Sequence, residues 1–436
     1  MGSVNWVIKN MIRQSARVSC LLNRKSKINH LKLGLRYSSV GSAKENVKSD
    51  KYTLKFNGPQ VEVKDPTWDK SISLPFIWLR DHCRCSKCYN HTTSQRILDL
   101  LSIPEDIHPA ECSLQNDVLE IKWPDDHHSE YPLDWLWKIS LNGYTDYSKN
   151  GPASPILWDA SPKSVERIAR VPLASYMSTA GKGKPLTADA ATPGLVEVVH
   201  SLVKYGVAFV DGVHPSLEGT HGVVKQLALI KHTLFGGMFE FGDAMSHADS
   251  SYTNQYVGVH TDNTYFKEAA GLLVLHCIHH EGVGGENILV DGLRAAEELR
   301  LKNPEAHACL MEEETEGEYI DTGKGQHYTH CGPILNYSKT TGQFVQLRFN
   351  LYDRAPLRTI PADRITKFYS ALKLFAKELS SPEATWTFKL TPGTVMLIDN
   401  WRVLHGRTEY TGKRRMNGCY IDRGDFESTA RILGLF

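Results

Sequence analysis

Apolar residues along this chain gather in many short runs separated by turn-forming residues, a pattern typical of β-strands. In residues 45–140 the turns are rich in Pro, Asp and Asn, which predicts a small β-rich domain. Residues 141–185 are rich in Gly, Ser, Pro and Lys and indicate a linker. The strands expected in the first domain are Tyr52–Phe56, Gln60–Val63, Ile77–Leu79 and Val118–Lys122.

Residues 186–436 form a second predicted domain, in which helical patterns interrupt the strand-like runs. Many short strands with a few covering helices favour a mainly β fold with flanking helices, a double-stranded β-helix or jelly-roll, over an alternating parallel sheet. The expected helices are Leu195–Tyr205, His221–Leu234, Leu293–Arg300 and Ala362–Leu379, and the expected strands are Val207–Val210, Gln255–Val259, Leu272–Ile278, Asn287–Val290, Phe344–Phe349, Trp386–Leu390, Thr394–Ile398 and Gly418–Ile421.

The composition narrows the class of protein. Hydrophobic residues make up 41% and charged residues 23% of the 436 positions, as in ordinary globular proteins, which excludes collagen-like, wholly disordered and disulfide-knot chains. No apolar run approaches the roughly 18–20 residues that cross a bilayer, so no membrane span is expected. The sequence has no G-x-G-x-x-G motif and no P-loop, which argues against nucleotide chemistry.

The net charge of +1 conceals an uneven distribution. Residues 1–44 hold nine basic and no acidic residues, which leaves 41 basic against 49 acidic residues in the rest of the chain. A mildly acidic body offers no surface for nucleic acid. The basic segment places Lys9, Arg13 and Arg17 on one helical face, which predicts a transit peptide and a location in the mitochondrial matrix. A disordered basic tail is the alternative.

An H-x-D motif is one candidate metal site. His260 and Asp262 follow the expected strand Gln255–Val259, and residues two apart on a strand point the same way, so both can reach one metal ion. Two imidazoles and one carboxylate are the ligands of mononuclear iron oxygenases. Alternatives remain, because 19 histidines make chance matches frequent. The competing pairs are His247 with Asp249 and His279 with Glu281.

The third ligand has to come from another segment. His405 follows an apolar strand and a turn, and nine residues later Arg414 begins another strand-like run. An arginine behind the metal presents a planar, permanently charged fork to a dicarboxylate such as 2-oxoglutarate. The alternative is a histidine satisfied within a turn and a solvated surface arginine.

Three longer runs make the pattern specific, and in them the chain resembles the γ-butyrobetaine hydroxylase/trimethyllysine dioxygenase family of Fe(II)/2-oxoglutarate oxygenases. The runs are His260–Phe266, Gly284–Gly292 and Asp399–Arg407. The resemblance covers about residues 50–436. Within the family, the trimethyllysine branch is the more similar one, through Asn263–Phe266, Tyr352–Ala355 and Thr429–Leu435.

The resemblance implies an activity and a set of ligands. It assigns His260, Asp262 and His405 to Fe(II) and Arg414 to 2-oxoglutarate. Asn287 departs from the Thr or Ser that the family often has near 2-oxoglutarate, but its amide can still donate a hydrogen bond there. The expected reaction uses O2 to hydroxylate N6,N6,N6-trimethyl-L-lysine at C3, the first step of carnitine biosynthesis, with ascorbate as reductant. A homodimer is expected. The alternatives are γ-butyrobetaine hydroxylation and, from another class, a non-catalytic zinc-stapled scaffold.

Both candidate substrates carry a quaternary ammonium, which has no N–H to donate. Aromatic faces recognise such a cation through attraction of roughly 0.5–2 kcal/mol per ring. By the resemblance, the rings are Phe235, Phe239, Tyr252 and Tyr420, and aromatic residues buried in a core are the alternative. Two further residues are candidates for contact with the rest of the substrate. These are Asp249, for the α-ammonium that only trimethyllysine carries, and Asn350.

A second candidate metal site lies in the first domain. Cys83, Cys85 and Cys88 place three thiols within six residues, and His127 follows. Three thiolates and one imidazole complete a closed tetrahedral zinc site, which stabilises a small domain with little core. His128 is a competing ligand, and three buried thiols without metal are the alternative.

Overall fold

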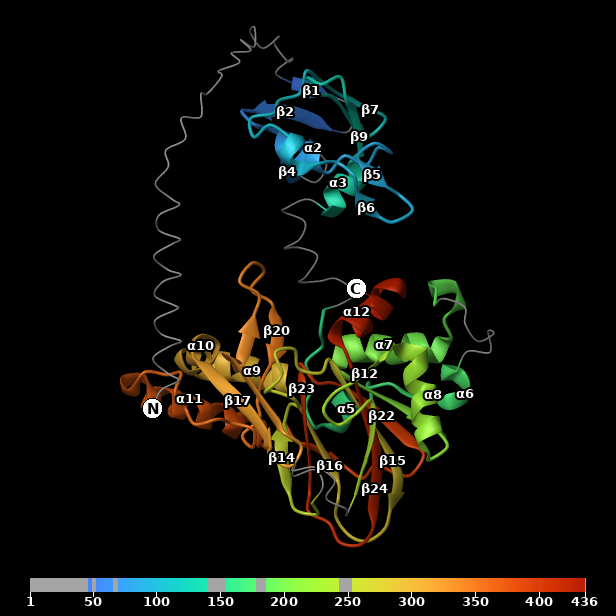
Figure 1. Ribbon diagram of the computed structural model, residues 1–436, viewed down its shortest axis with the longest axis vertical. Coiled ribbons are helices and arrows are strands. Elements are labelled where there is room, and N and C mark those ends of the chain that lie inside the picture. The colour runs from blue at the N-terminus through green and yellow to red at the C-terminus, as the bar shows by residue number, and fades with distance from the viewer. Residues whose placement is uncertain are drawn as a thin grey trace, which may run out of the picture. The chain divides into compact units, whose positions relative to one another are not determined.

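The computed structural model describes residues 46–48, 52–65, 70–139, 154–177, 186–242 and 253–435. The chain divides into two compact units, Met1–Trp137 and Lys138–Phe436, which Figure 1 colours from blue to red along the sequence. Among the described helices, none is long and apolar enough to cross a membrane. The expected transit peptide and the candidates His247, Asp249 and Tyr252 lie outside the described residues.

The first unit contains two antiparallel sheets and a core of its own. Strands β1 to β4 form a four-stranded sheet, β7 to β9 form a three-stranded sheet, and β5 and β6 form a short hairpin. Trp123 and Tyr131 are fully buried in the core. The bounds are β1 Asn46–Lys48, β2 Thr53–Asn57, β3 Gln60–Asp65, β4 Lys70–Pro75, α2 Phe76–Asp81, β5 Tyr89–Asn90, β6 Gln95–Arg96, η1 Leu100–Ser102, β7 Glu111–Gln115, β8 Val118–Lys122, β9 His128–Pro132 and α3 Leu133–Ile139.

The expected strand Ile77–Leu79 is wrong, because this segment lies within helix α2. The buried residues of the helix are Phe76, Leu79 and Arg80, whose spacing of three and four positions places them on one helical face. Three apolar residues are too short a window to distinguish the period of a helix from that of a strand.

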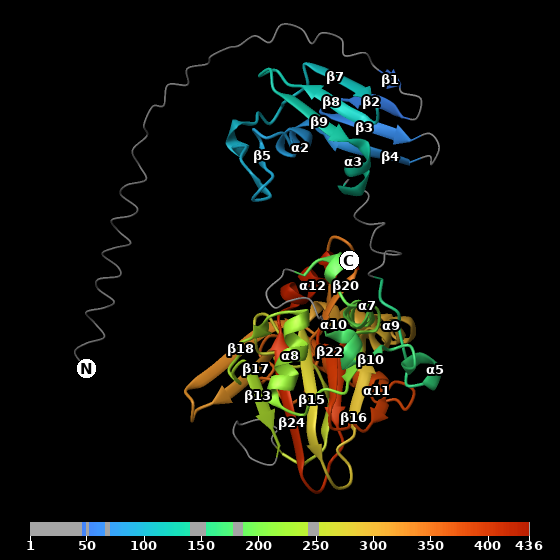
Figure 2. The same ribbon diagram turned by 90° about the vertical axis from the view of Figure 1, so that its right-hand side faces the viewer.

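The second unit is mainly β with helices on its outer faces, as expected (Figure 1, Figure 2). Its larger sheet has seven strands and its smaller sheet has four. All pairs are antiparallel except β10 with β11. The larger sheet contains β10 Arg170–Pro172, β11 Val207–Asp211, β22 Thr394–Asp399, β15 Leu272–His280, β24 Arg414–Ile421, β12 Ile230–Lys231 and β13 Met238–Phe241, and the smaller sheet contains β14 Val257–His260, β23 Val403–Arg407, β16 Asn287–Asp291 and β21 Trp386–Phe388.

Alternation along the strands explains these layers. In β22, Met396 and Ile398 face the core that the two sheets share, whereas Val395 and Leu397 face helices on the opposite side. The helices that pack on this outer face are α7 Pro193–Tyr205, α8 Leu217–Leu227 and α12 Arg423–Ile432. The helices that pack outside the smaller sheet are α9 Gly292–Lys302, α10 Pro304–Glu312 and α11 Ala362–Leu379.

Two boundaries differ from the sequence-based expectation. The helix expected at His221–Leu234 begins earlier, at Leu217, because the side chain of Ser216 caps its first turn by accepting from the N–H of Gly219. It ends at Leu227, and the backbone of Ala228 is extended. Within the expected linker, residues 154–177 contain α5 Pro162–Val165, β10 and α6 Leu173–Tyr176. Since β10 pairs with β11, this part of the expected linker belongs to the larger sheet. Two hairpins complete the unit, β17 Glu314–Asp321 with β18 Gln326–Pro333 and β19 Leu335–Tyr337 with β20 Phe344–Leu347.

Candidate active site

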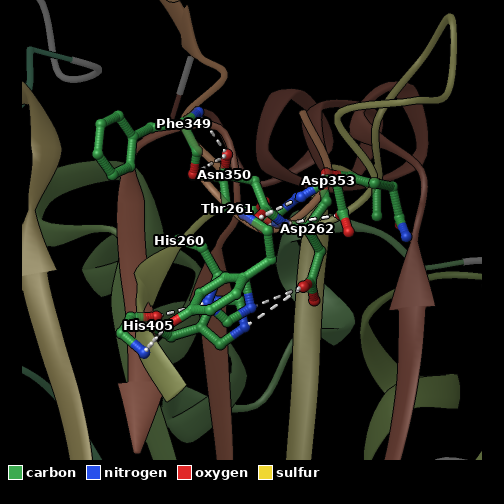
Figure 3. Close-up of polar contacts among 12 residues, drawn as sticks. His260, Thr261, Asp262, Phe349, Asn350, Asp353 and His405 are labelled. Atoms are coloured by element: carbon green, nitrogen blue, oxygen red, sulfur yellow. Dashed lines mark hydrogen bonds and ion pairs between the residues drawn. The ribbon is translucent and has the colours of Figure 1, made fainter. Parts of the chain in front are cut away.

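His260, Asp262 and His405 come together where strand β14 ends. This strand pairs with β23, and the register places His260 directly opposite His405. Asp262 follows two residues after the end of β14. His405 points to the shared core, as does Val403 two residues earlier on the same strand. Figure 3 shows both imidazoles facing the carboxylate of Asp262.

These three side chains are close enough to share a metal ion. Nε2 of His260 lies 3.4 Å from Oδ1 of Asp262, and Nε2 of His405 lies 3.5 Å from the same oxygen. One ligand atom from each residue lies within 4.8 Å of the other two. Two imidazoles and one carboxylate form the facial set of non-haem Fe(II) oxygenases, which leaves other coordination positions open. The donor set and its spacing therefore fit Fe(II).

Hydrogen bonds orient the two ligands of the H-x-D motif. Nδ1 of His260 donates to the carbonyl oxygen of Gly258 at 2.8 Å, so Nε2 faces the site. The hydroxyl of Tyr420 donates to Oδ2 of Asp262 at 2.9 Å. The side chain of Asn400 accepts from the N–H of Asp262 at 2.8 Å and donates to its carbonyl oxygen at 3.1 Å. Asp262 is thus held by its backbone and by Oδ2, and Oδ1 is presented to the histidines.

Burial and mutual electrostatics shift the pKa values of the three groups. Burial alone would raise the pKa of the Asp262 carboxyl, but the His405 and His260 imidazoles beside it lower that pKa well below its usual range. Burial lowers the pKa of His405, which keeps this imidazole neutral. At His260 burial acts in the same direction, but the hydrogen bond and the charge of Asp262 raise the pKa overall. The site therefore holds an ionised carboxylate between its two imidazoles.

Two buried arginines line the same pocket. Arg407 and Arg414 are 6% and 4% exposed. Burial, reinforced by the neighbouring charge of Arg407, lowers the pKa of Arg414 to about 10. Nε of Arg414 and Nδ2 of Asn287 are buried and have no hydrogen-bond partner among the described residues. Buried donors without partners favour an anion with several acceptor oxygens, so this end of the pocket suits a dicarboxylate.

Aromatic rings form another wall of the pocket. The ring centroids of Phe239 and Tyr420 are 5.2 Å apart, and those of Phe235 and Phe239 are 6.0 Å apart. All three residues line the pocket that contains the iron-type ligands. The faces of these rings can attract a cation through the ring quadrupole, and this attraction needs no hydrogen bond.

Asn350 lines the pocket, but its amide is already engaged in the turn that follows β20. Its Oδ1 accepts from the N–H of Tyr352 at 2.9 Å, and its Nδ2 donates to Oδ2 of Asp353 at 2.7 Å. Tyr352, Asp353 and Arg407 also line the pocket, and sequence reasoning assigned no role to them. The only sequence signal was their presence in motifs that resemble the family.

The competing pair His279 and Glu281 forms an ion pair, with Nε2 3.1 Å from Oε1. In the part of the chain that the structure describes, no third metal-binding side chain joins this pair. The pair therefore lacks the donor set of an iron site.

The first unit holds a second cluster of metal-binding side chains. The Sγ atoms of Cys83, Cys85 and Cys88 lie 3.3, 3.5 and 3.5 Å from Nε2 of His127. Zinc bonds of about 2.3 Å to sulfur and about 2.0 Å to nitrogen in a tetrahedron separate such atoms by about 3.5 Å. His128 is exposed and is not in the cluster. The three sulfur–nitrogen distances therefore fit a tetrahedral site.

Arg80 and Asp125 support this cluster from one side. Nη1 of Arg80 donates to Sγ of Cys88 at 3.4 Å, and Nη2 donates to Oδ2 of Asp125 at 3.3 Å. Oδ1 of Asp125 accepts from the backbone N–H of His127 at 3.1 Å. Burial and the charge of Arg80 lower the pKa of His127, which keeps its imidazole neutral and able to bind a metal.

Comparison with known proteins gives the family. Residues 170–420 match the family model "Taurine catabolism dioxygenase TauD, TfdA family", and residues 53–137 match "Gamma-butyrobetaine hydroxylase-like, N-terminal". Among solved structures, an asparagine oxygenase in complex with Fe(II), hydroxyasparagine and succinate matches 54% of this chain and 81% of that chain at 15% identity, with a TM-score of 0.44.

Curated relatives match most of the chain. It is 39% identical to the mitochondrial trimethyllysine dioxygenase of Homo sapiens, over 84% of this chain and 83% of that protein. It is 33% identical to the trimethyllysine dioxygenase of Meyerozyma guilliermondii, over 87% and 95% of the two chains. Identity to the γ-butyrobetaine dioxygenase of Pongo abelii is 28%, over 84% and 92% of the two chains. The chain therefore belongs to the TauD, TfdA dioxygenase family and, within it, to the trimethyllysine dioxygenase branch.

Proposed function

We propose that this chain is an Fe(II)- and 2-oxoglutarate-dependent dioxygenase that hydroxylates trimethyllysine at C3. The observation that carries the proposal is the cluster of His260, Asp262 and His405, whose ligand atoms lie within 4.8 Å of one another in a pocket with buried arginines and aromatic rings. Identities of 38% and 39% to two mitochondrial trimethyllysine dioxygenases support the substrate and a mitochondrial location, for which we propose the matrix.

In this proposal the side chains of the pocket hold the metal ion and the cosubstrate in position. His260, Asp262 and His405 hold Fe(II), while Arg414 and Asn287 bind the carboxylate of 2-oxoglutarate that lies away from the metal. With 2-oxoglutarate and O2, bound Fe(II) supplies the chemistry that replaces a C–H hydrogen by a hydroxyl, giving succinate and carbon dioxide as coproducts. Ascorbate is proposed as the reductant that keeps the iron ferrous.

The rings of Phe235, Phe239 and Tyr420 are proposed to bind the quaternary ammonium of the substrate. They stand in the same pocket as the metal ligands, and cation–π attraction is the recognition available to a cation without N–H groups. Tyr252 is proposed as a further ring and Asp249 as a further charged contact, both outside the described residues.

Parallel turnover of the two family substrates tests the proposal. The protein is loaded with Fe(II) and 2-oxoglutarate without oxygen, exposed to O2 with either trimethyllysine or γ-butyrobetaine, and analysed by mass spectrometry. We expect hydroxytrimethyllysine and one succinate per hydroxylation, and loss of both in His260→Ala. Preferential turnover of γ-butyrobetaine would assign the chain to that reaction. A folded protein with neither iron binding nor succinate formation would support the scaffold alternative.

We further propose that Cys83, Cys85, Cys88 and His127 bind a structural Zn(II). The near-tetrahedral spacing of their four ligand atoms supports this site. Metal analysis of the purified protein should give one zinc per chain. The assembly is proposed to be a homodimer, which light scattering in solution tests.

A further inference from the structure

We propose that Asp353 binds the α-ammonium of the substrate and thereby selects an amino acid over a substrate that lacks this group. The inference rests on the proposed hydroxylation of trimethyllysine and adds a residue that determines its specificity. It starts from the charges that line the pocket. Among the described lining residues, Asp262 and Asp353 are the two acids, and Asp262 belongs to the metal ligands.

Hydrogen bonds connect the turn that carries Asp353 to the H-x-D motif. The N–H of Thr261 donates to the carbonyl oxygen of Phe349 at 2.8 Å, and the N–H of Phe349 donates to Oγ1 of Thr261 at 3.0 Å. Thr261 is the residue between the two ligands, so the segment beginning at Phe349 lies beside the metal site. Figure 3 shows Phe349, Asn350 and Asp353 next to the H-x-D motif.

The carboxylate of Asp353 is also fixed in direction. Nδ2 of Asn350 donates to its Oδ2 at 2.7 Å, and Oδ1 of Asn350 accepts from the N–H of Asp353 at 3.3 Å. The carbonyl oxygen of Asp353 accepts from the N–H of Glu318 in β17 at 2.7 Å. Nδ2 of Asn350 also lies 3.4 Å from the carbonyl oxygen of Thr261, so the same amide connects the carboxylate of Asp353 to the H-x-D motif. A carboxylate held in this way loses little side-chain entropy when it binds a cation.

The position of the reacting carbon requires an acceptor close to the metal. In trimethyllysine the α-ammonium is on C2, two covalent bonds and about 2.5 Å from C3. When C3 stands over the metal, the ammonium stands beside the metal ligands, whereas the quaternary nitrogen is four bonds from C3 and reaches the aromatic wall. Asp353 has the position that the α-ammonium requires, because it lines the same pocket as His260 and Asp262 and lies beside the H-x-D motif (Figure 3).

A charge-selective binding experiment tests this assignment. Binding of trimethyllysine is compared with binding of 6-(trimethylammonio)hexanoate, which is the same molecule without the α-ammonium. Calorimetry is performed on the full chain with Mn(II) and 2-oxoglutarate, so that no turnover occurs. The test variant is Asp353→Asn, whose amide oxygen still accepts from Asn350. The matched control is Asp363→Asn, which removes the same charge at an exposed position in the first turn of α11.

We expect Asp353→Asn to weaken binding of trimethyllysine by roughly 10- to 100-fold, the range of a lost charge-assisted hydrogen bond, and to leave binding of the deamino analogue within about twofold. The control should bind both ligands like the wild type. Equal weakening of both ligands would show that Asp353 only shapes the pocket, and unchanged binding of both would show that it makes no contact. Either result overturns the inference.

Two further outcomes distinguish a failure of the proposed function from a failure of the assignment to Asp353. If the wild-type protein neither binds nor hydroxylates trimethyllysine or the analogue, the proposed function itself is contradicted. If Asp249→Asn abolishes the discrimination and Asp353→Asn retains it, the ammonium is bound by Asp249 and the assignment to Asp353 fails.

Discussion

Tyr420 connects the aromatic wall of the pocket to Asp262, one of the proposed metal ligands, through one side chain. Its ring centroid lies 5.2 Å from that of Phe239, and its hydroxyl donates to Oδ2 of Asp262 at 2.9 Å. This contact occupies the carboxylate oxygen that does not face the histidines. In the proposed Fe(II) site, Tyr420 would keep Oδ2 engaged and leave Oδ1 of Asp262 to hold the metal ion.

Tyr420→Phe separates the two roles. The ring remains, so affinity for the quaternary ammonium should change less than affinity for the metal. Removal of the hydrogen bond to Asp262 should weaken Fe(II) or Mn(II) binding by about tenfold, the lower end of the effect of residues that support metal ligands. Calorimetric titration of the metal, alongside titration of trimethyllysine at saturating metal, measures both. Unchanged metal affinity would show that the hydrogen bond does not position the carboxylate.

At the scale of single residues, the sequence predicts those features of the site that depend on the spacing of neighbouring residues. The H-x-D spacing after a strand made His260 and Asp262 one of three candidate pairs, and the resemblance to the family selected this pair. Their ligand atoms and that of His405 lie within 4.8 Å of one another. Asp353 was not predicted, because its direction depends on the turn organised by Asn350 and on a backbone bond to Glu318. The hydroxyl contact of Tyr420 was missed for the same reason, since it joins residues 158 positions apart.

Strand β24 determines how closely the aromatic wall can approach the sheet. A Cβ atom built at Gly418 would lie 2.2 Å from Cε2 of Phe239. The register places Gly418 directly opposite Phe239 of β13, so the glycine provides the space that the ring occupies. At this position the absence of a side chain is a requirement of the pocket.

We therefore expect Gly418→Ala to displace the Phe239 ring. Displacement should raise the KM for trimethyllysine by roughly 2- to 30-fold, the range for loss of one cation–π contact, and overpacking should cost about 1–3 kcal/mol of stability. Steady-state kinetics and thermal unfolding measure the two effects. Gly222→Ala in α8 is the matched control, because no atom lies within 4 Å of the added Cβ and alanine favours a helix. Equal KM values in the two variants would contradict this role of the glycine.

The errors made at the level of elements have a common cause. Ile77–Leu79 was expected to be a strand and the helix near His221 was expected to extend to Leu234. In both segments apolar residues are dense, and the outcome depends on which neighbours they pack against. The longer strands of the second unit were predicted well, since alternating burial on two faces repeats along each of them.

At the scale of the whole molecule, the chain carries two units with separate cores and separate metal-type clusters. The Cys3His cluster lies in Met1–Trp137, and the cluster around His260 lies in Lys138–Phe436. The different patterns of strands and helices before and after residues 141–185 had predicted two domains.

Cys85→Ser should therefore affect the first unit and leave the oxygenase site intact. Loss of one thiolate removes a ligand of the closed tetrahedral site, so bound zinc should fall well below one per chain. In a unit of this size the unfolding temperature should fall by about 4–8 °C per kcal/mol lost. Cys112→Ser is the matched control, because Cys112 lies in the same unit outside the cluster. Metal analysis and calorimetry should separate the two variants, while Mn(II) binding in the presence of 2-oxoglutarate stays at the wild-type level in both. Equal zinc content and equal unfolding temperatures in the two variants would contradict a role of Cys85 as a ligand of a stabilising zinc ion.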